Sequence, residues 1–207
     1  MDVEVRRLRQ KTRPKVKAIL RTRVCYDEKG LIGQYKAHVL PVLEASVGAI
    51  YHASNTQLKK IDGVQASFLH GLCLSPPDAF LRYNLAPLQL RRDIGILGLL
   101  FKVASGLAHP DFELLFRIDN RERNWHTRFN ENLHPKQFVD ICDGSQSELV
   151  NRSIFSAVKV WNRLPGHLLD VSSVRVFQRL LTERARHACR DGVENWEYLY
   201  SRRKDIR

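Results

Sequence analysis

Basic side chains near the start of this sequence are the residues whose type and spacing could do chemistry. Residues 1–23 contain nine lysines and arginines but only two acidic side chains, Asp2 and Glu4, which gives a local net charge of +7. The whole chain of 207 residues carries +12, so more than half of the net charge lies here. Such a one-signed segment favours a polyanionic partner such as nucleic acid. The alternative that stays open is a charged face in contact with solvent.

Eight cations are the candidate phosphate contacts. Arginine and lysine bind phosphate oxygens through charge-assisted hydrogen bonds that position a nucleic acid without reading its bases. If about five of them neutralise phosphates, the logarithm of the affinity should fall with the logarithm of the salt concentration with a slope of about −4 to −5. The candidates are six N-terminal residues and a second pair near the middle of the chain: Arg6, Arg9, Arg13, Lys15, Lys17, Arg21, Arg91 and Arg92.

A second basic segment, residues 121–129, contains the aromatic residues Trp125 and Phe129. Exposed aromatic rings could stack on unpaired bases while the arginines between them follow phosphates. We favour the alternative, in which both rings fold back and fix the segment to the helices, because Trp usually has partners in a core. The same choice arises at Trp161, which we expect to be structural.

Catalytic and metal-binding patterns are poorly represented. The sequence has no Gly-rich phosphate loop, no H-E-x-x-H pair and no Gly-x-Ser-x-Gly elbow. A nucleophilic Cys25 or Cys142 would need a histidine from a distant segment. His70 with Cys73, and Asp140 with Asp143, are each about one helical turn apart, but two ligands do not make a metal site. We therefore expect no cofactor and no metal.

The element that must position the second pair of cations is a helix within residues 85–106. Four large apolar residues recur at helical spacing: Leu90, Ile94, Leu97 and Phe101. Pro87 suits the first turn and Gly106 suits a left-handed stop. The pattern predicts a central core helix, with Arg91, Arg92 and Lys102 directed outward.

Helical periodicity extends over most of the remaining chain. Within residues 1–23 we expect a short helix followed by a second one that starts at Pro14. Pro41 either kinks the helix of residues 31–51 or divides it in two. Thr56 and Ser75 are the expected N-caps of the next two helices, and Ser172 or Ser173 that of the last long one. Short helical segments are expected after Pro110 and after Ser153.

Residues 117–150 are polar and lack a sustained period, which predicts one long polar loop. The fold class predicted is therefore an all-α, irregular helical bundle. Its expected parts are a bundle with basic N-terminal helices over residues 1–116, the loop of residues 117–150, and a C-terminal helical extension over residues 151–207. The N-terminus has charges where a signal peptide has apolar residues, and the longest apolar run is Ile94–Phe101. We expect an intracellular, soluble chain without a membrane partner, in the nucleus or the cytoplasm.

Several short segments form an ordered set: Tyr35-Lys36, Val39-Leu40-Pro41, Leu43-Glu44-Ala45, Leu58, Ile61, Val64-Gln65, Leu85-Ala86-Pro87-Leu88, Arg91-Arg92, Leu100-Phe101-Lys102, Arg152, Val160-Trp161-Asn162-Arg163-Leu164-Pro165 and Ser173–Phe177. The set covers about residues 12–185. It resembles the region that follows the polymerase core in LINE-type (non-LTR) retrotransposon reverse transcriptases. The resemblance implies a helical thumb and a C-terminal extension that hold a template–primer duplex, while a palm carries out RNA-directed DNA synthesis.

The palm of that family needs an aromatic-x-Asp-Asp turn, because two carboxylates hold the metal ions of the reaction. This sequence lacks the turn: Tyr26-Asp27-Glu28 has another spacing, and Phe138-Val139-Asp140-Ile141 has one acid. We therefore expect a non-catalytic fragment of such an RNA-directed DNA polymerase. Its expected partners are an RNA–DNA or DNA duplex and a separate or missing palm, and no small-molecule substrate. The alternative function is a helical protein-interaction scaffold without a nucleic-acid role.

Overall fold

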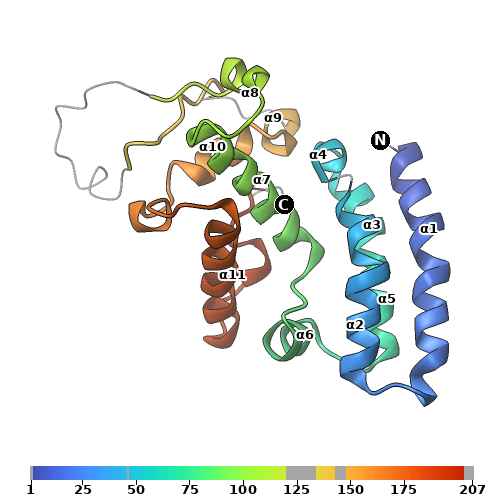
Figure 1. Ribbon diagram of the computed structural model, residues 1–207. Helices are drawn as coiled ribbons and strands as arrows, with labels where there is room; N and C mark the ends of the chain where they lie inside the picture. The colour runs from blue at the N-terminus through green and yellow to red at the C-terminus, as the bar shows by residue number, and fades with distance from the viewer. Residues whose placement is uncertain (1, 46, 120–133, 143–147, 203–207) are drawn as a thin grey trace. The chain divides into compact units, whose positions relative to one another are not determined.

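A computed structural model of the chain describes residues 2–45, 47–119, 134–142 and 148–202. The fold is an all-α helical bundle, as the sequence predicts (Figure 1). Across the described residues, β-type pairing is limited to an isolated antiparallel bridge between Ile118 and Phe138. The chain forms two compact units. Unit 1 comprises Met1–Arg92 and Arg186–Glu197, and unit 2 comprises Asp93–Ala185 and Tyr198–Arg207.

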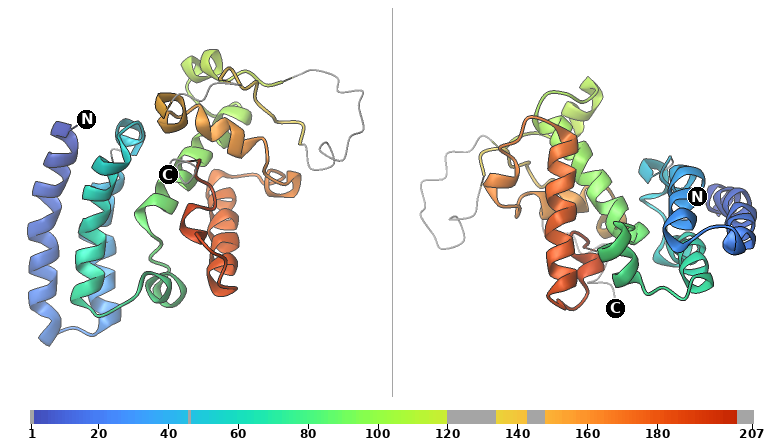
Figure 2. Two further views of the ribbon diagram at one scale, coloured as in Figure 1. Left: turned by 180° about the vertical axis from the view of Figure 1, so that it is seen from behind. Right: turned by 60° about the horizontal axis from the view of Figure 1, so that its bottom comes forward.

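Unit 1 is built around three helices that lie side by side, α1 (Asp2–Arg21), α2 (Glu28–His38) and α5 (Asn55–Gly71) (Figures 1 and 2). Tyr35 of α2 stacks on Phe68 of α5 with the ring centroids 4.4 Å apart. Both residues are fully buried, so this stack lies in the core of the unit. The other elements with residues in unit 1 are η1 (Thr22–Val24), α3 (Leu40–Glu44), α4 (Val47–Ile50), α6 (Pro76–Tyr83), the start of α7 (Leu88–Ala104), the end of α11 (Val174–Arg190) and η3 (Trp196–Tyr198).

Helix starts in unit 1 follow the local chemistry of the sequence, with one correction. Ser75 caps α6 as predicted, because its hydroxyl accepts a hydrogen bond from the Asp78 amide at 3.2 Å. The cap of α5 is Ser54 and not Thr56. Ser54 has the extended backbone of an N-cap and accepts from the Gln57 amide, whereas Thr56 already lies in the first helical turn.

Pro41 marks a division into two helices, one of the two alternatives that the sequence left open. α2 ends at His38, and Pro41 lies in the first turn of α3, where its missing N–H has no helical partner to lose. The break brings the C-terminal carbonyl groups of α2 within reach of side chains from α1. Lys15 of α1 makes one of these contacts, to the carbonyl oxygen of His38.

Unit 2 contains most of α7 and α11, together with α8 (Pro110–Leu115), α9 (Glu148–Arg152), α10 (Ser156–Trp161) and η2 (Gly166–Leu168). α7 ends as predicted, since Gly106 has a φ of +66°, a left-handed conformation that suits glycine. Trp161 is fully buried and its ring centroid lies 5.8 Å from that of Phe177, which stacks on Phe101 at 4.8 Å. The structural interpretation of Trp161 is therefore confirmed.

Residues 134–138 of the predicted polar loop are held by hydrogen bonds to Trp161 and Asn162. Trp161 donates through its indole nitrogen to the Lys136 carbonyl oxygen at 2.7 Å. The side chain of Asn162 makes two hydrogen bonds to the backbone of Phe138, as an acceptor at 2.9 Å and as a donor at 2.8 Å. Regular structure resumes at Glu148, two residues before the predicted end of the loop. The pair Trp161-Asn162 thus fixes residues 134–138 to the core.

Candidate nucleic-acid interface

α1 presents an apolar face to the core of unit 1 and a basic face to solvent. Its buried residues recur at intervals of three or four: Val5, Leu8, Thr12, Val16 and Ile19. This spacing keeps them on one side of the helix, which packs against α5. Thr12 is the polar residue of this set, and its buried hydroxyl group donates a hydrogen bond to the Leu8 carbonyl oxygen at 2.7 Å.

Pro14 lies inside α1 and does not begin a new helix, so the prediction of two helices in this segment is wrong. A proline in a helix interior costs roughly 3 kcal/mol, because it cannot donate to the carbonyl four residues earlier. That carbonyl belongs to Gln10, and both residues are exposed, so water can hydrate it. Burial of four aliphatic side chains contributes roughly 1.5–3 kcal/mol each. The apolar face therefore outweighs the proline.

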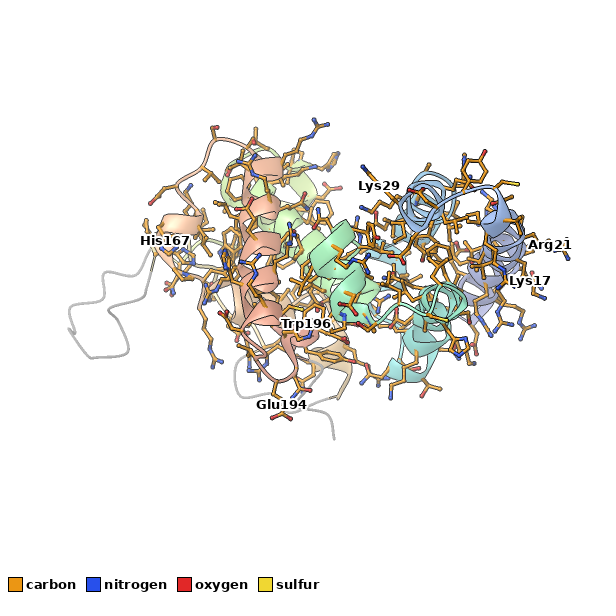
Figure 3. The ribbon with its side chains drawn as sticks, turned by 90° about the horizontal axis from the view of Figure 1, so that it is seen from below. Lys17, Arg21, Lys29, His167, Glu194 and Trp196 are labelled. Carbon is orange, nitrogen blue, oxygen red and sulfur yellow. The ribbon has the colours of Figure 1, made fainter. Side chains whose placement is uncertain are left out.

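Five of the six N-terminal candidates lie along one edge of α1, which we call the basic stripe: Arg6, Arg9, Arg13, Lys17 and Arg21. Four of them follow one another at four-residue intervals, and Arg6 is seven residues before Arg13, so all are neighbours on the helix surface. At 1.5 Å per residue the stripe is about 22 Å long. Arg9 is half-buried and the others are exposed. Lys17 and Arg21 extend outward from α1 (Figure 3).

Most of the basic stripe lacks carboxylate partners within the part of the chain that the structure describes. No ion pair there involves Arg6, Arg13, Lys17 or Arg21, whereas Arg7, outside the stripe, lies 3.2 Å from a Glu4 oxygen. Like charges four residues apart on a helix destabilise it by roughly 0.2–0.5 kcal/mol per pair. A bound polyanion would remove this repulsion.

An open groove of about 560 Å³ adjoins the middle of the basic stripe. It lies between α1 and α5 and is lined by Arg13, Pro14, Val16, Lys17, Leu20, Val64 and Ser67. Two cations of the stripe therefore border an apolar floor. The hydroxyl group of Ser67 donates to the Gly63 carbonyl oxygen at 2.7 Å and remains able to accept a hydrogen bond.

Lys15 does not belong to the basic stripe. It is two residues from Arg13 and Lys17, which places it on the other side of α1, since two residues turn a helix by about 200°. Its ammonium group donates to the His38 carbonyl oxygen at 3.1 Å. His38 is the last residue of α2, so Lys15 supplies a cation to the negative end of that helix. The structure gives this candidate a partner inside the protein.

The second candidate pair does not extend the stripe, and the outward orientation predicted for Arg92 is wrong. Arg92 is only 3% exposed, and its two Nη atoms donate to the carboxylate oxygens of Asp62 at 2.7 and 2.9 Å. It also donates to the Gln89 side chain at 2.9 Å. Burial of a guanidinium requires such pairing, and a bidentate carboxylate fits its fork. Arg92 is therefore a structural residue of unit 1.

Arg91 is partly exposed and also has an internal partner, because its Nε donates to the carboxylate of Glu44. The positive charge of Arg91 also affects the pKa of the nearby Lys36. Burial lowers the pKa of Lys36, and the Arg91 guanidinium lowers it further. The ammonium group of Lys36 donates to the Tyr83 carbonyl oxygen. Cations in this part of unit 1 are thus held by acceptors of the protein itself.

Lys60 was missed among the candidates. It is exposed on α5, four residues before Val64 and seven before Ser67, both of which line the groove beside the stripe. Residues at these intervals share one face of a helix, so Lys60 lies on the α5 face that borders the groove. The spacing of these three residues within the helix predicted to start near Thr56 could have identified it.

Some predicted features lie outside the described residues, including the segment with Trp125 and Phe129. Where the structure is described, three or more His, Cys, Asp or Glu side chains nowhere gather as a metal site. The described helices include none with the length and apolar character needed to cross a membrane. The basic stripe with its groove is therefore the candidate site that the described residues support best.

No protein-family model matches the sequence, and searches of curated proteins and of solved structures found no significant match.

Proposed function

We propose that unit 1 binds the phosphate backbone of a nucleic acid through the basic stripe of α1. The observation that carries this proposal is the row of cations about 22 Å long on the exposed edge of a helix, most of them without a carboxylate partner among the described residues. Cations in such a row contact phosphates and not base edges, so the affinity should depend only weakly on the base sequence of the nucleic acid.

The nucleic acid that we propose is a template–primer duplex, RNA–DNA or DNA, as the resemblance to LINE-type reverse transcriptases implies. An all-α fold is compatible with a helical thumb. We further propose that the chain is a non-catalytic fragment, because its sequence lacks the paired aspartates of that family's palm. Nucleotide incorporation by the purified chain with Mg²⁺ or Mn²⁺ would contradict this second proposal.

The test is fluorescence anisotropy with a labelled RNA–DNA hybrid and a duplex DNA, titrated with the full chain between 50 and 200 mM salt. With five phosphate contacts, the slope of log affinity against log salt should be about −4.5 for duplex DNA. The triple variant R13Q/K17Q/R21Q removes three contacts, so its slope should be about −1.8. Circular dichroism would verify that the variant is folded.

The matched control is R175Q/R179Q/R190Q, which removes the same charge from three exposed positions on α11. It should keep the slope of the unmodified chain. Equal losses in both triple variants would mean that only the net charge matters, and they would contradict the assignment to α1. Absent or salt-insensitive binding by the unmodified chain would leave the protein-interaction scaffold as the better hypothesis.

A further inference from the structure

Unit 2 contains a small pocket whose lining is rich in arginine and comes from three separate segments. The end of α10 and the residues after it contribute Val160, Arg163 and Leu164, α11 contributes Arg184, and the C-terminal segment contributes Leu199, Tyr200, Ser201 and Arg202. The pocket has a volume of about 270 Å³. We call it the arginine pocket. Its lining includes no residue of α1, but the choice of a nucleic-acid ligand for it rests on the function proposed for unit 1.

The walls of the arginine pocket are held in place by contacts in the core of unit 2. Arg163 directly follows Trp161 and Asn162, whose hydrogen bonds to residues 136 and 138 fix the end of α10. The phenol of Tyr200 donates to the Leu181 carbonyl oxygen at 2.9 Å. Burial raises the pKa of Tyr200, so the phenol is neutral at physiological pH. The backbone that carries Arg163 and the side chain of Tyr200 are therefore held in place, while the side chains of Arg163 and Arg184 are exposed.

The charge of the arginine pocket is one-signed. Three guanidinium groups line it and no carboxylate does. Among the described residues, neither Arg163 nor Arg184 takes part in an ion pair, and the pair nearest in sequence on α11, between Arg179 and Glu183, is exposed. The side chains of Arg163 and Arg184 are exposed, so their attraction for an anion should weaken as the salt concentration rises.

We propose that the arginine pocket binds a terminal phosphate group, and that the 5′ end of a nucleic-acid strand supplies it. Arginine forks match phosphate oxygens in bidentate geometry. A phosphate monoester carries about −1.5 to −2 charges at neutral pH, which matches the two guanidinium groups of Arg163 and Arg184 better than the single charge of a backbone diester does. At about 270 Å³ the pocket is smaller than sites for drug-sized ligands, so it takes the phosphate and leaves the rest of the strand outside.

The experiment compares 5′-phosphorylated and 5′-hydroxyl thymidine trinucleotides, both labelled at the 3′ end, in binding to the full chain. The phosphorylated trinucleotide should bind about tenfold more tightly, because one charge-assisted hydrogen bond contributes about 1.5 kcal/mol or more. R163Q and R184Q should each remove most of this preference. R184K keeps the charge but loses the fork, so its preference should be intermediate.

Two controls separate the pocket from general charge. R175Q removes a charge from an exposed position of α11 outside the pocket and should keep the preference, as should the triple variant of α1. Circular dichroism reports the folding of every variant, and R163K replaces R163Q if the latter is unfolded. Equal affinity for the two trinucleotides, or a loss of preference in R175Q, would overturn the proposal. Inorganic phosphate that competes as strongly as the phosphorylated strand would overturn the assignment to a strand end.

Discussion

The basic stripe of α1 and the first two turns of α7 carry the same kind of side chain in opposite surroundings. Arg13 and Lys17 are exposed and border an open groove, whereas Arg92 is buried and holds the carboxylate of Asp62 with two hydrogen bonds. Arg91 likewise donates to Glu44. The difference lies in the partners and not in the arginines themselves. A cation is available for a ligand when no carboxylate lies beside it in the folded chain. Whether a carboxylate lies there depends on residues far away in the sequence.

The largest expected effect tests the structural side of this comparison. Replacing Arg92 with Met removes two hydrogen bonds to the carboxylate of Asp62 and one to the side chain of Gln89. We expect the free energy of unfolding to fall by about 2–3 kcal/mol, because hydrogen bonds to charged groups are lost while Asp62 can still be partly hydrated. Urea unfolding followed by circular dichroism measures this. R13M should change stability by less than about 0.5 kcal/mol, and equal losses would contradict the distinction.

His134 extends the comparison to a buried base that has no ion pair with a carboxylate among the described residues. It is 4% exposed, its Nε2 lies 3.0 Å from the Trp161 carbonyl oxygen, and burial lowers its pKa, with a smaller contribution from Lys136. Near pH 6.5 the unfolded chain therefore binds this proton to a greater extent than the folded chain does. Stability should therefore decline as the pH falls through 6.5, by at most about 1.4 kcal/mol per pH unit.

The measurement for His134 is the urea midpoint at several pH values between 5.5 and 7.5, for the unmodified chain and for His134→Gln. Comparing the two slopes cancels the contributions of the other histidines. The variant should show the weaker pH dependence. Parallel slopes would mean that His134 takes up its proton equally in the folded and unfolded chains.

The smallest expected effect comes from two lysines on the same helix. K17Q and K15Q remove the same charge, but Lys17 belongs to the basic stripe while Lys15 donates to the last carbonyl group of α2. K17Q should weaken nucleic-acid binding a few-fold and make the salt slope shallower by about 0.9. K15Q should leave the slope unchanged. A reversed outcome would move the interface to the other side of α1.

Periodicity and capping predict much of this fold, because they act over a few residues. The spacing of Leu90, Ile94, Leu97 and Phe101 identified a buried helix, and Gly106 marked its end, both as observed. At Pro14 a local rule failed. The apolar residues on both sides of the proline continue one face of the helix, and their burial outweighs the missing hydrogen bond.

The candidate site was only partly predictable, since its residues acquire their roles through distant partners. Arg92 meets Asp62 across 30 residues of sequence, and Lys15 meets the carbonyl of His38 across 23. The arginine pocket combines residues from three segments, and no local pattern links them. The basic stripe, in contrast, lies within one helix, so its four-residue spacing is visible in the sequence.

Pro14 also has a consequence for how α1 opens. Amide hydrogens in a helix are protected from exchange by their bonds to carbonyl groups four residues earlier, and local opening exposes them in cooperative segments. Pro14 has no amide hydrogen, and the Gln10 carbonyl receives none from it. We expect hydrogen exchange to resolve α1 into two segments of different protection, one on each side of Pro14. Arg6 and Arg9 would then belong to a segment that frays from the N-terminus, while Lys17 and Arg21 stay in the more persistent half.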